Sequence, residues 1–145
     1  ANDATGRPLA LTLAHAGGLT LAALAGGCDL EIVAPRPPAD WHDLLGPAGS
    51  ALARTLASVS GEDFDLAATR VWGARECLKK AGLAVNTPLT LVEAAGDAVR
   101  FAAGGRALVT IACRPDGVAA VAALLAEEDA PAAAGARSPG RLAGS

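Results

Sequence analysis

Residues 65–82, DLAATRVWGARECLKKAG, predict a long amphipathic helix. Ser60 with Asp63 three residues later is typical of a capping box at a helix start, and Gly82 is typical of a helix stop. An amphipathic helix needs an apolar surface on which to bury one face. The rest of the chain therefore has to supply that surface.

The exposed side of this helix carries charged residues in rows. Because residues four apart lie on one face of a helix, Trp72, Glu76 and Lys80 form one row, and Arg75 and Lys79 form a basic row beside it. A solvated helix face with a Glu–Lys pair has the same pattern, and such a pair contributes only about 0.2–0.5 kcal/mol. The helix alone leaves both a structural and a functional interpretation open.

The core has to be built from leucine, valine and alanine, because hydrophobic residues make up 52% of the chain but aromatic residues only 3%. The length of 145 residues fits one domain. No apolar run reaches the roughly 18 residues of a membrane span, and a net charge of −3 argues against nucleic-acid binding. Three widely spaced cysteines and a first segment unlike a signal peptide predict a soluble, cytoplasmic protein.

A strand hairpin is predicted near the start of the chain. Residues 6–8 (Gly-Arg-Pro) form a turn, and leucines then alternate with smaller residues as far as His15. The segment Ala-Gly-Gly at 16–18 predicts a turn before a returning strand at 19–24. A single histidine at a strand end is more often structural than catalytic.

Residues 28–33 predict a strand with two carboxylates on one face. Asp29 and Glu31 share that face, while Cys28, Leu30 and Ile32 share the other. Neighbouring carboxylates repel each other unless a cation or solvent separates them, and hard cations such as Mg²⁺ prefer oxygen ligands. A strand with one solvated face would look the same, so the pattern indicates either a metal site or an ordinary wet surface.

Between this strand and the long helix, the sequence predicts two short helical pieces. A proline-rich connector at 34–38 precedes a piece that Asp40 caps and that Gly46 and Pro47 end, and a second piece covers 50–58. His42 is expected at the surface of this region.

The C-terminal half predicts an antiparallel sheet. Residues 118–125 are rich in alanine, which favours a helix, but the turn at 115–117 favours a returning strand, which we adopt. The predicted fold class is α+β, an antiparallel sheet with helix 65–82 packed across it. We expect one domain at 1–128 and a disordered tail at 129–145. The predicted strands are 89–92, 99–102, 107–113 and 118–125.

Four motifs in order carry a family resemblance. They are Gly-Arg-Pro at 6–8, Ala-His at 14–15, Gly-Cys-Asp-Leu-Glu at 27–31 and WGARECLKK at 72–80. In this combination the chain resembles the 4′-phosphopantetheinyl transferases of the two-lobed, surfactin-synthetase-activating type. It is most similar to the C-terminal transferase domain of iterative enediyne polyketide synthases, over residues 6–128.

The resemblance implies a magnesium-dependent transferase that uses coenzyme A. Asp29, Glu31 and Glu76 match the ligands of a Mg²⁺ ion that bridges the coenzyme A pyrophosphate. Glu76 also matches the residue that helps to deprotonate the acceptor serine, and Lys80 matches the lysine that pairs with the phosphates. A metal held by carboxylates, together with a lysine, suits a reaction that mainly requires charge neutralisation. The same oxygen ligands suit Mn²⁺.

Arg7, Pro8 and His15 match positions that bind the nucleotide and its phosphates. The chain departs from the family at two positions near the site. Ala14 replaces a serine whose hydroxyl donates to a phosphate, and Arg75 replaces a lysine, a change that keeps the charge but not the geometry.

The implied partner is an acyl carrier protein of a polyketide synthase, converted from its apo to its holo form. Two-lobed members carry another lobe before the Gly-Arg-Pro turn, whereas five residues precede that turn here. We therefore expect pairing with an upstream lobe or self-association. The alternatives are a catalytically incomplete module that docks a carrier protein, and an unrelated α+β domain with a chance cluster of carboxylates.

Overall fold

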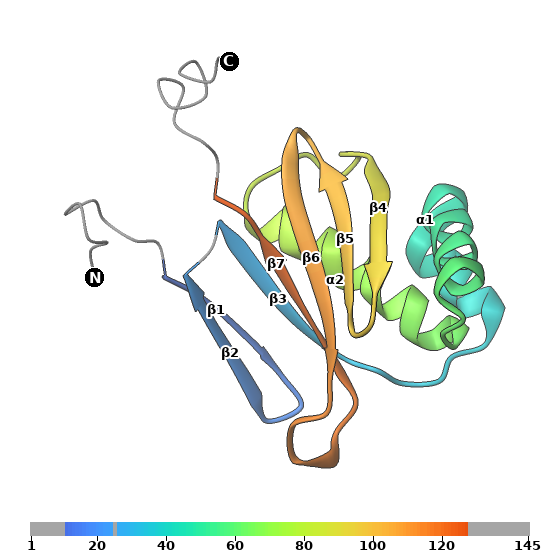
Figure 1. The fold of residues 1–145 in the computed structure, drawn as a ribbon, viewed down its shortest axis with the longest axis horizontal. Helices are drawn as coiled ribbons and strands as arrows, with labels where there is room; N and C mark the ends of the chain where they lie inside the picture. Colours follow the sequence, from blue (N-terminus) through green and yellow to red (C-terminus); the bar gives the residue numbers. More distant parts are fainter. Residues whose placement is uncertain (1–10, 25, 128–145) are drawn as a thin grey trace.

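The computed structural model describes residues 11–24 and 26–127. Within them the chain forms a hairpin, a third strand, two helices and four further strands (Figure 1). A short 3₁₀ turn, Pro115–Gly117, precedes the last strand. The elements are β1 (Leu11–Ala16), β2 (Leu19–Leu24), β3 (Gly27–Ile32), α1 (Pro38–Ser60), α2 (Phe64–Lys80), β4 (Leu89–Ala95), β5 (Ala98–Ala103), β6 (Arg106–Cys113) and β7 (Ala120–Leu125).

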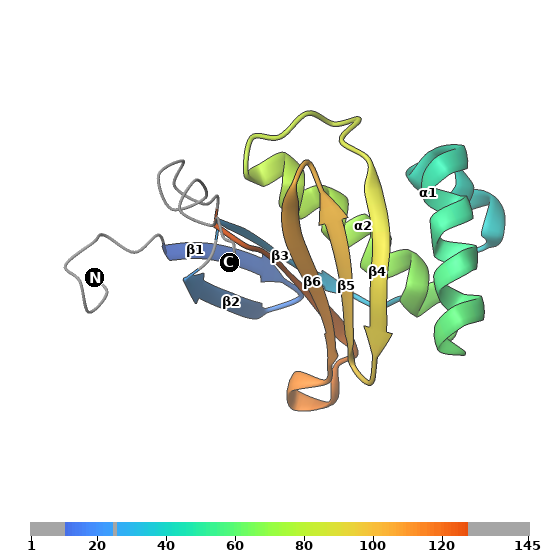
Figure 2. The same ribbon diagram turned by 45° about the horizontal axis from the view of Figure 1, so that its top comes forward.

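Five strands form an antiparallel sheet in the order β3-β7-β6-β5-β4, and β1 pairs with β2 in a separate hairpin. Helix α2 lies across one face of the sheet, and α1 packs beside α2 and next to β4 (Figures 1 and 2). The hairpin packs on β3. The predicted α+β class, with an antiparallel sheet and the long helix across it, is confirmed.

The core lies between α2 and the sheet. Small residues on α2, among them Ala67 and Ala74, let the helix approach the strands closely. Phe101 is the one aromatic side chain in this cluster of described residues. As predicted, aliphatic residues fill the rest, chiefly Leu56, Leu78, Val99, Leu108 and Leu125.

The start of α2 differs from the predicted capping box. Asp63 is the N-cap residue, and its side chain makes no cap hydrogen bond. The Ser60 hydroxyl instead donates to the Leu56 carbonyl at 2.8 Å and accepts from the Glu62 N–H at 3.2 Å. Ser60 is the last residue of α1, so its hydroxyl serves the end of that helix.

The predicted glycine stop of α2 is confirmed. Gly82 adopts a φ of 84°, and the Leu83 N–H donates to the Leu78 carbonyl at 3.0 Å. This bond spans the C-terminal turn as in a Schellman motif, which favours glycine because the left-handed conformation has no Cβ penalty there.

The two predicted helical pieces are halves of one kinked helix, α1. Gly46 has φ 73° and ψ 177°, which no helical residue adopts, and Pro47 follows it. The break is therefore where the sequence predicts it. The first half starts earlier than predicted, because Pro38 occupies the first turn, which tolerates a proline, and Asp40 lies inside the helix.

All predicted strands with described residues are present; β4, β5 and β6 are longer than predicted, and β7 is two residues shorter. Residues 120–125 form β7, so the strand interpretation of this alanine-rich segment is confirmed. Strand β7 pairs with β3 on one side and β6 on the other, with Asp29 opposite Ala123.

In the described ranges, neither helix is long and apolar enough to span a membrane. The predicted turn at 6–8 and the predicted tail at 129–145 lie outside the described residues.

Candidate functional site

Both faces of β3 are covered. Cys28 and Leu30 pack with Ala14 of the hairpin, while Asp29 and Glu31 face α2. Asp29 is 2% exposed. The alternative of a solvated strand face is therefore wrong for Asp29, because the helix covers the carboxylates that alternation places on that side.

Helix α2 presents Gly73, Glu76 and Lys80 toward these carboxylates. A Cβ on Gly73 would lie 3.5 Å from the Glu31 Cγ and 3.8 Å from the Asp29 Oδ2. A glycine at this position thus keeps side-chain bulk away from the acidic pair. Glu76 lies near enough that its charge raises the pKa of Glu31.

An ion pair joins the two elements. The Lys80 Nζ lies 2.5 Å from the Asp29 Oδ1, across 51 residues of sequence. The lysine side chain is 46% exposed and the aspartate side chain is 2% exposed. The hydrogen bond to Asp29 is the main cause that raises the pKa of Lys80 above its usual value. A charge-assisted bond of this kind stabilises both charged groups.

Glu31 is the most perturbed acid of the site. Burial, then the hydrogen bond with Asp29, then the charges of Asp29 and Glu76 raise its pKa from 4.5 to about 8, against a smaller opposing effect of Lys80. Asp29 Oδ2 is buried and accepts no hydrogen bond from an N–H or hydroxyl group. A proton on Glu31 would satisfy this oxygen, and the raised pKa keeps that proton on Glu31 at neutral pH.

The chemistry of these residues fits a hard divalent cation. They offer carboxylate oxygens, one of which, Asp29 Oδ2, is buried without a partner. In the conformation described for residues 11–24 and 26–127, however, no three acidic, histidine or cysteine residues are arranged to hold a metal ion. Asp29 and Glu31 are together, and Glu76 adjoins them without completing a set of ligands.

Of the residues expected to bind coenzyme A, Lys80 lies at this site and His15 lies on the hairpin. His15 is exposed on the hairpin, with its Nδ1 3.0 Å from the Thr20 Oγ1 of the opposite strand. Ala14 is buried between the hairpin and β3. Arg7 and Pro8 lie outside the described residues.

Arg75 turns away from the carboxylates. Its guanidinium donates to the Leu45 carbonyl, at the end of the first half of α1. The kink at Gly46 removes the normal helical partner of this carbonyl, so Arg75 replaces it. Trp72 packs into the cluster between α1 and α2. Of the predicted row, Trp72 therefore packs between the helices, while Glu76 and Lys80 lie at the acidic site.

The sequence interpretation missed Arg70. Its side chain is 1% exposed and donates to the Glu62 carboxylate at 2.9 Å, and to the backbone carbonyls of Asp97 and Thr110 at 3.0 Å each. The signal was available, because Arg70 stands in the helix row that contains Ala67, Ala74 and Leu78, which are all buried. A charge in a buried row requires partners from other elements.

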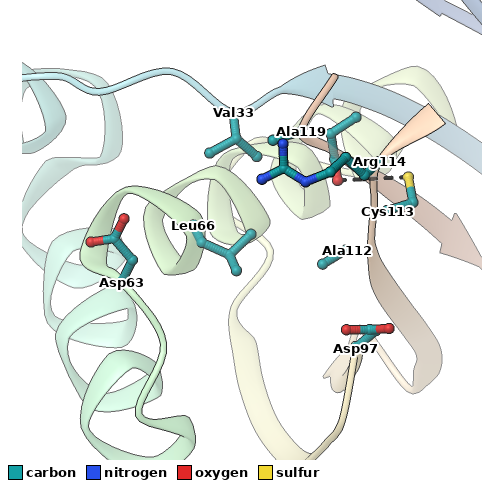
Figure 3. Close-up of a pocket in the computed structure, with 9 residues that line it drawn as sticks. Val33, Asp63, Leu66, Asp97, Ala112, Cys113, Arg114 and Ala119 are labelled. Carbon is teal, nitrogen blue, oxygen red and sulfur yellow. Dashed lines mark hydrogen bonds between the residues drawn. The ribbon is translucent and has the colours of Figure 1, made fainter. Parts of the chain in front are cut away.

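A separate pocket of about 370 Å³ lies at the other end of α2 from Lys80 (Figure 3). Asp63 and Leu66 come from the start of α2, Asp97 from the β4–β5 turn, and Cys113 and Arg114 from the end of β6. The Cys113 thiol donates to the Ala120 carbonyl at 3.6 Å. Within residues 11–24 and 26–127, none of the residues predicted to be functional lines this pocket.

No protein-family model matches the chain, and no curated protein or solved structure matches it.

Proposed function

We propose that this domain transfers the 4′-phosphopantetheine arm of coenzyme A to a serine of an acyl carrier protein, with Mg²⁺ as cofactor. One observation carries the proposal. Asp29 and Glu31 of β3 lie against Glu76 and Lys80 of α2, and these are the four residues to which the sequence resemblance gives the chemistry. The contact between Lys80 and Asp29, which are 51 residues apart in the chain, is what that resemblance requires.

The acidic residues would hold the cation. Asp29, Glu31 and Glu76 offer only oxygen donors, as a Mg²⁺ ion prefers. When bound, the ion neutralises the negative charge of the coenzyme A pyrophosphate. Because its pKa is raised to about 8, Glu31 holds a proton at neutral pH, and it would have to release this proton to act as a cation ligand.

The protein's own groups handle the proton and the developing charge. Glu76 accepts the proton of the serine hydroxyl, whose oxygen forms a bond to the phosphorus that carries pantetheine. The bond from that phosphorus to the bridging pyrophosphate oxygen breaks, and adenosine 3′,5′-bisphosphate leaves. Lys80 stabilises the charge that collects on the leaving phosphate.

The same resemblance supplies the setting. The acceptor is a carrier protein of a polyketide synthase, and the reaction takes place in the cytoplasm. An upstream lobe or a second copy of the chain provides the remaining surface for coenzyme A.

Intact-protein mass spectrometry tests the proposal. An apo acyl carrier protein is incubated with the domain, coenzyme A and Mg²⁺, and the expected result is a mass gain of one phosphopantetheine arm. Asp29→Asn and Glu76→Gln should each lower the rate by about 100-fold or more, because they remove a cation ligand and the base. Glu93→Gln, at an exposed position of β4, is the matched control and should retain the rate.

The mass assay, together with a binding measurement on the same carrier protein, distinguishes a transferase from a module that only docks the carrier protein. A domain that binds the carrier protein but leaves its mass unchanged, also when joined to an upstream lobe, would reject the transferase and support docking. A domain that neither binds nor modifies it would reject both.

A further inference from the structure

Asp29 has no oxygen available to an incoming ion in this structure. Its Oδ1 is bound by the Lys80 ammonium at 2.5 Å, and its Oδ2 is buried. A cation can reach this carboxylate only if one of its neighbours moves.

Lys80 is the neighbour that can move. Strand β3, which carries Asp29, is paired to β7 along its length, and Gly73 above the carboxylate offers only helix backbone. Lys80 is the last residue of α2, and its side chain is 46% exposed. Its four-carbon stem rotates freely once the ammonium is released.

We propose that Lys80 is a built-in competitor for the divalent cation, so that cation entry at Asp29 and release of Lys80 are a single exchange. The ammonium holds the position of the cation until a divalent ion displaces it. This inference rests on the proposed function for the identity of the ion.

The exchange has a consequence for the order of events. While Lys80 is bound to Asp29, its ammonium is held beside the carboxylate and one of its three donors is used there, which limits how far it can reach toward a phosphate. Cation loading therefore frees Lys80 for the phosphates of the substrate. Without the cation, Lys80 stays bound to Asp29.

Isothermal titration calorimetry with Mg²⁺ and Mn²⁺ tests the exchange on the whole chain. Lys80→Met removes the competitor, and we expect it to tighten cation binding about tenfold, which corresponds to roughly 1.4 kcal/mol. Lys79→Met is the matched control, because it removes the same charge from an exposed neighbour. It should change the affinity by no more than about twofold, while Asp29→Asn should abolish binding.

A second measurement follows Lys80 in the wild-type protein and uses a variant only to assign the signal. In the wild-type protein, the ¹⁵N signal of the Lys80 side chain should shift as Mg²⁺ is added, and the shift should follow the calorimetric binding curve. Lys80→Arg assigns the signal by its loss.

The outcomes separate this inference from the proposed function. Cation binding that is equal or weaker in Lys80→Met, or a Lys80 signal that does not move while the ion binds, overturns the exchange and leaves the transferase intact. An exchange without phosphopantetheine transfer supports the competitor and rejects the transferase. Absence of cation binding in every variant overturns both.

Discussion

Arg70 shows how one charged residue can join three elements of this small fold. Its guanidinium reaches Glu62 in the loop between the helices, Asp97 in the β4–β5 turn and Thr110 in β6. Each of the three guanidinium nitrogens donates to at least one of these groups, so the arginine is paired in the interior although its side chain is 1% exposed.

Replacing Arg70 with methionine should lower the free energy of unfolding by about 3–5 kcal/mol. The volume is retained, but the Glu62 carboxylate, 12% exposed, loses its partner, and the Asp97 and Thr110 carbonyls lose a donor. Arg70→Lys should also destabilise the fold, since a compact ammonium does not reproduce the planar fork of donors with which the guanidinium reaches partners on three segments. Urea denaturation followed by circular dichroism measures the effect.

Arg100 provides the control for this prediction. It pairs with Glu93 at 2.9 Å, but both side chains are 54% exposed. Arg100→Met should change the free energy of unfolding by no more than about 1 kcal/mol. Equal losses at Arg70 and Arg100 would contradict the view that burial determines the value of these pairs.

At the scale of the element, the kink in α1 determines how the two helices meet. Gly46 turns the chain so that Trp41 and Leu45 of the first half pack in the same cluster as Ala53 of the second half. The break also frees the Leu45 carbonyl, to which Arg75 donates. Glycine is required because its φ of 73° and ψ of 177° lie where other residues are strained.

Gly46→Asn should therefore cost about 1–3 kcal/mol of stability. A Cβ at this position would meet nothing within 4 Å, so the loss would be conformational and not steric. Gly61 is the matched control, because its φ of 76° and ψ of 4° fall in the left-handed region that asparagine tolerates. Gly61→Asn should cost well under about 1 kcal/mol, measured by thermal and urea unfolding; similar losses at the two glycines would refute the interpretation.

At the scale of the whole molecule, the layers explain the burial of the acidic pair. Strand β3 lies between the hairpin on one side and α2 on the other, although it is an edge strand of the sheet. The hairpin covers Cys28 and Leu30 while α2 covers Asp29. At the end of α2 this buried arrangement meets solvent through Lys80, which is half exposed, while Asp29 beneath it is 2% exposed.

Periodicity and turn chemistry were enough to predict most elements and the face on which Asp29 and Glu31 lie. The helix 65–82, the break at Gly46 and the strand at 120–125 are all local patterns. Contacts between elements were not predictable in this way, because no local pattern states which carbonyl Arg75 reaches or that the hairpin covers β3. The Asp29–Lys80 pair also depends on how α2 crosses the sheet, which only the three-dimensional structure provides.

The acidic site should make the stability of the whole domain depend on pH. The pKa of Glu31 is about 8 in the folded protein and 4.5 without its surroundings. Between these values the folded state binds more protons than the unfolded state, so the free energy of unfolding should fall as the pH rises and should level off above about pH 8. Urea denaturation from about pH 5 to about pH 8.5, with a chelator to keep divalent ions away, measures this slope.

Glu31→Gln isolates the cause. Its carboxamide donates to Asp29 as a protonated Glu31 does, at every pH. We expect this variant to show a nearly flat profile and to be more stable than the wild type at about pH 8.5, whereas Glu93→Gln, at an exposed site, should retain the wild-type slope. A wild-type stability that rises from about pH 5 to about pH 8 would mean that Glu31 does not hold its proton in the folded protein. The carboxylate pair would then be ionised and held by Lys80 alone.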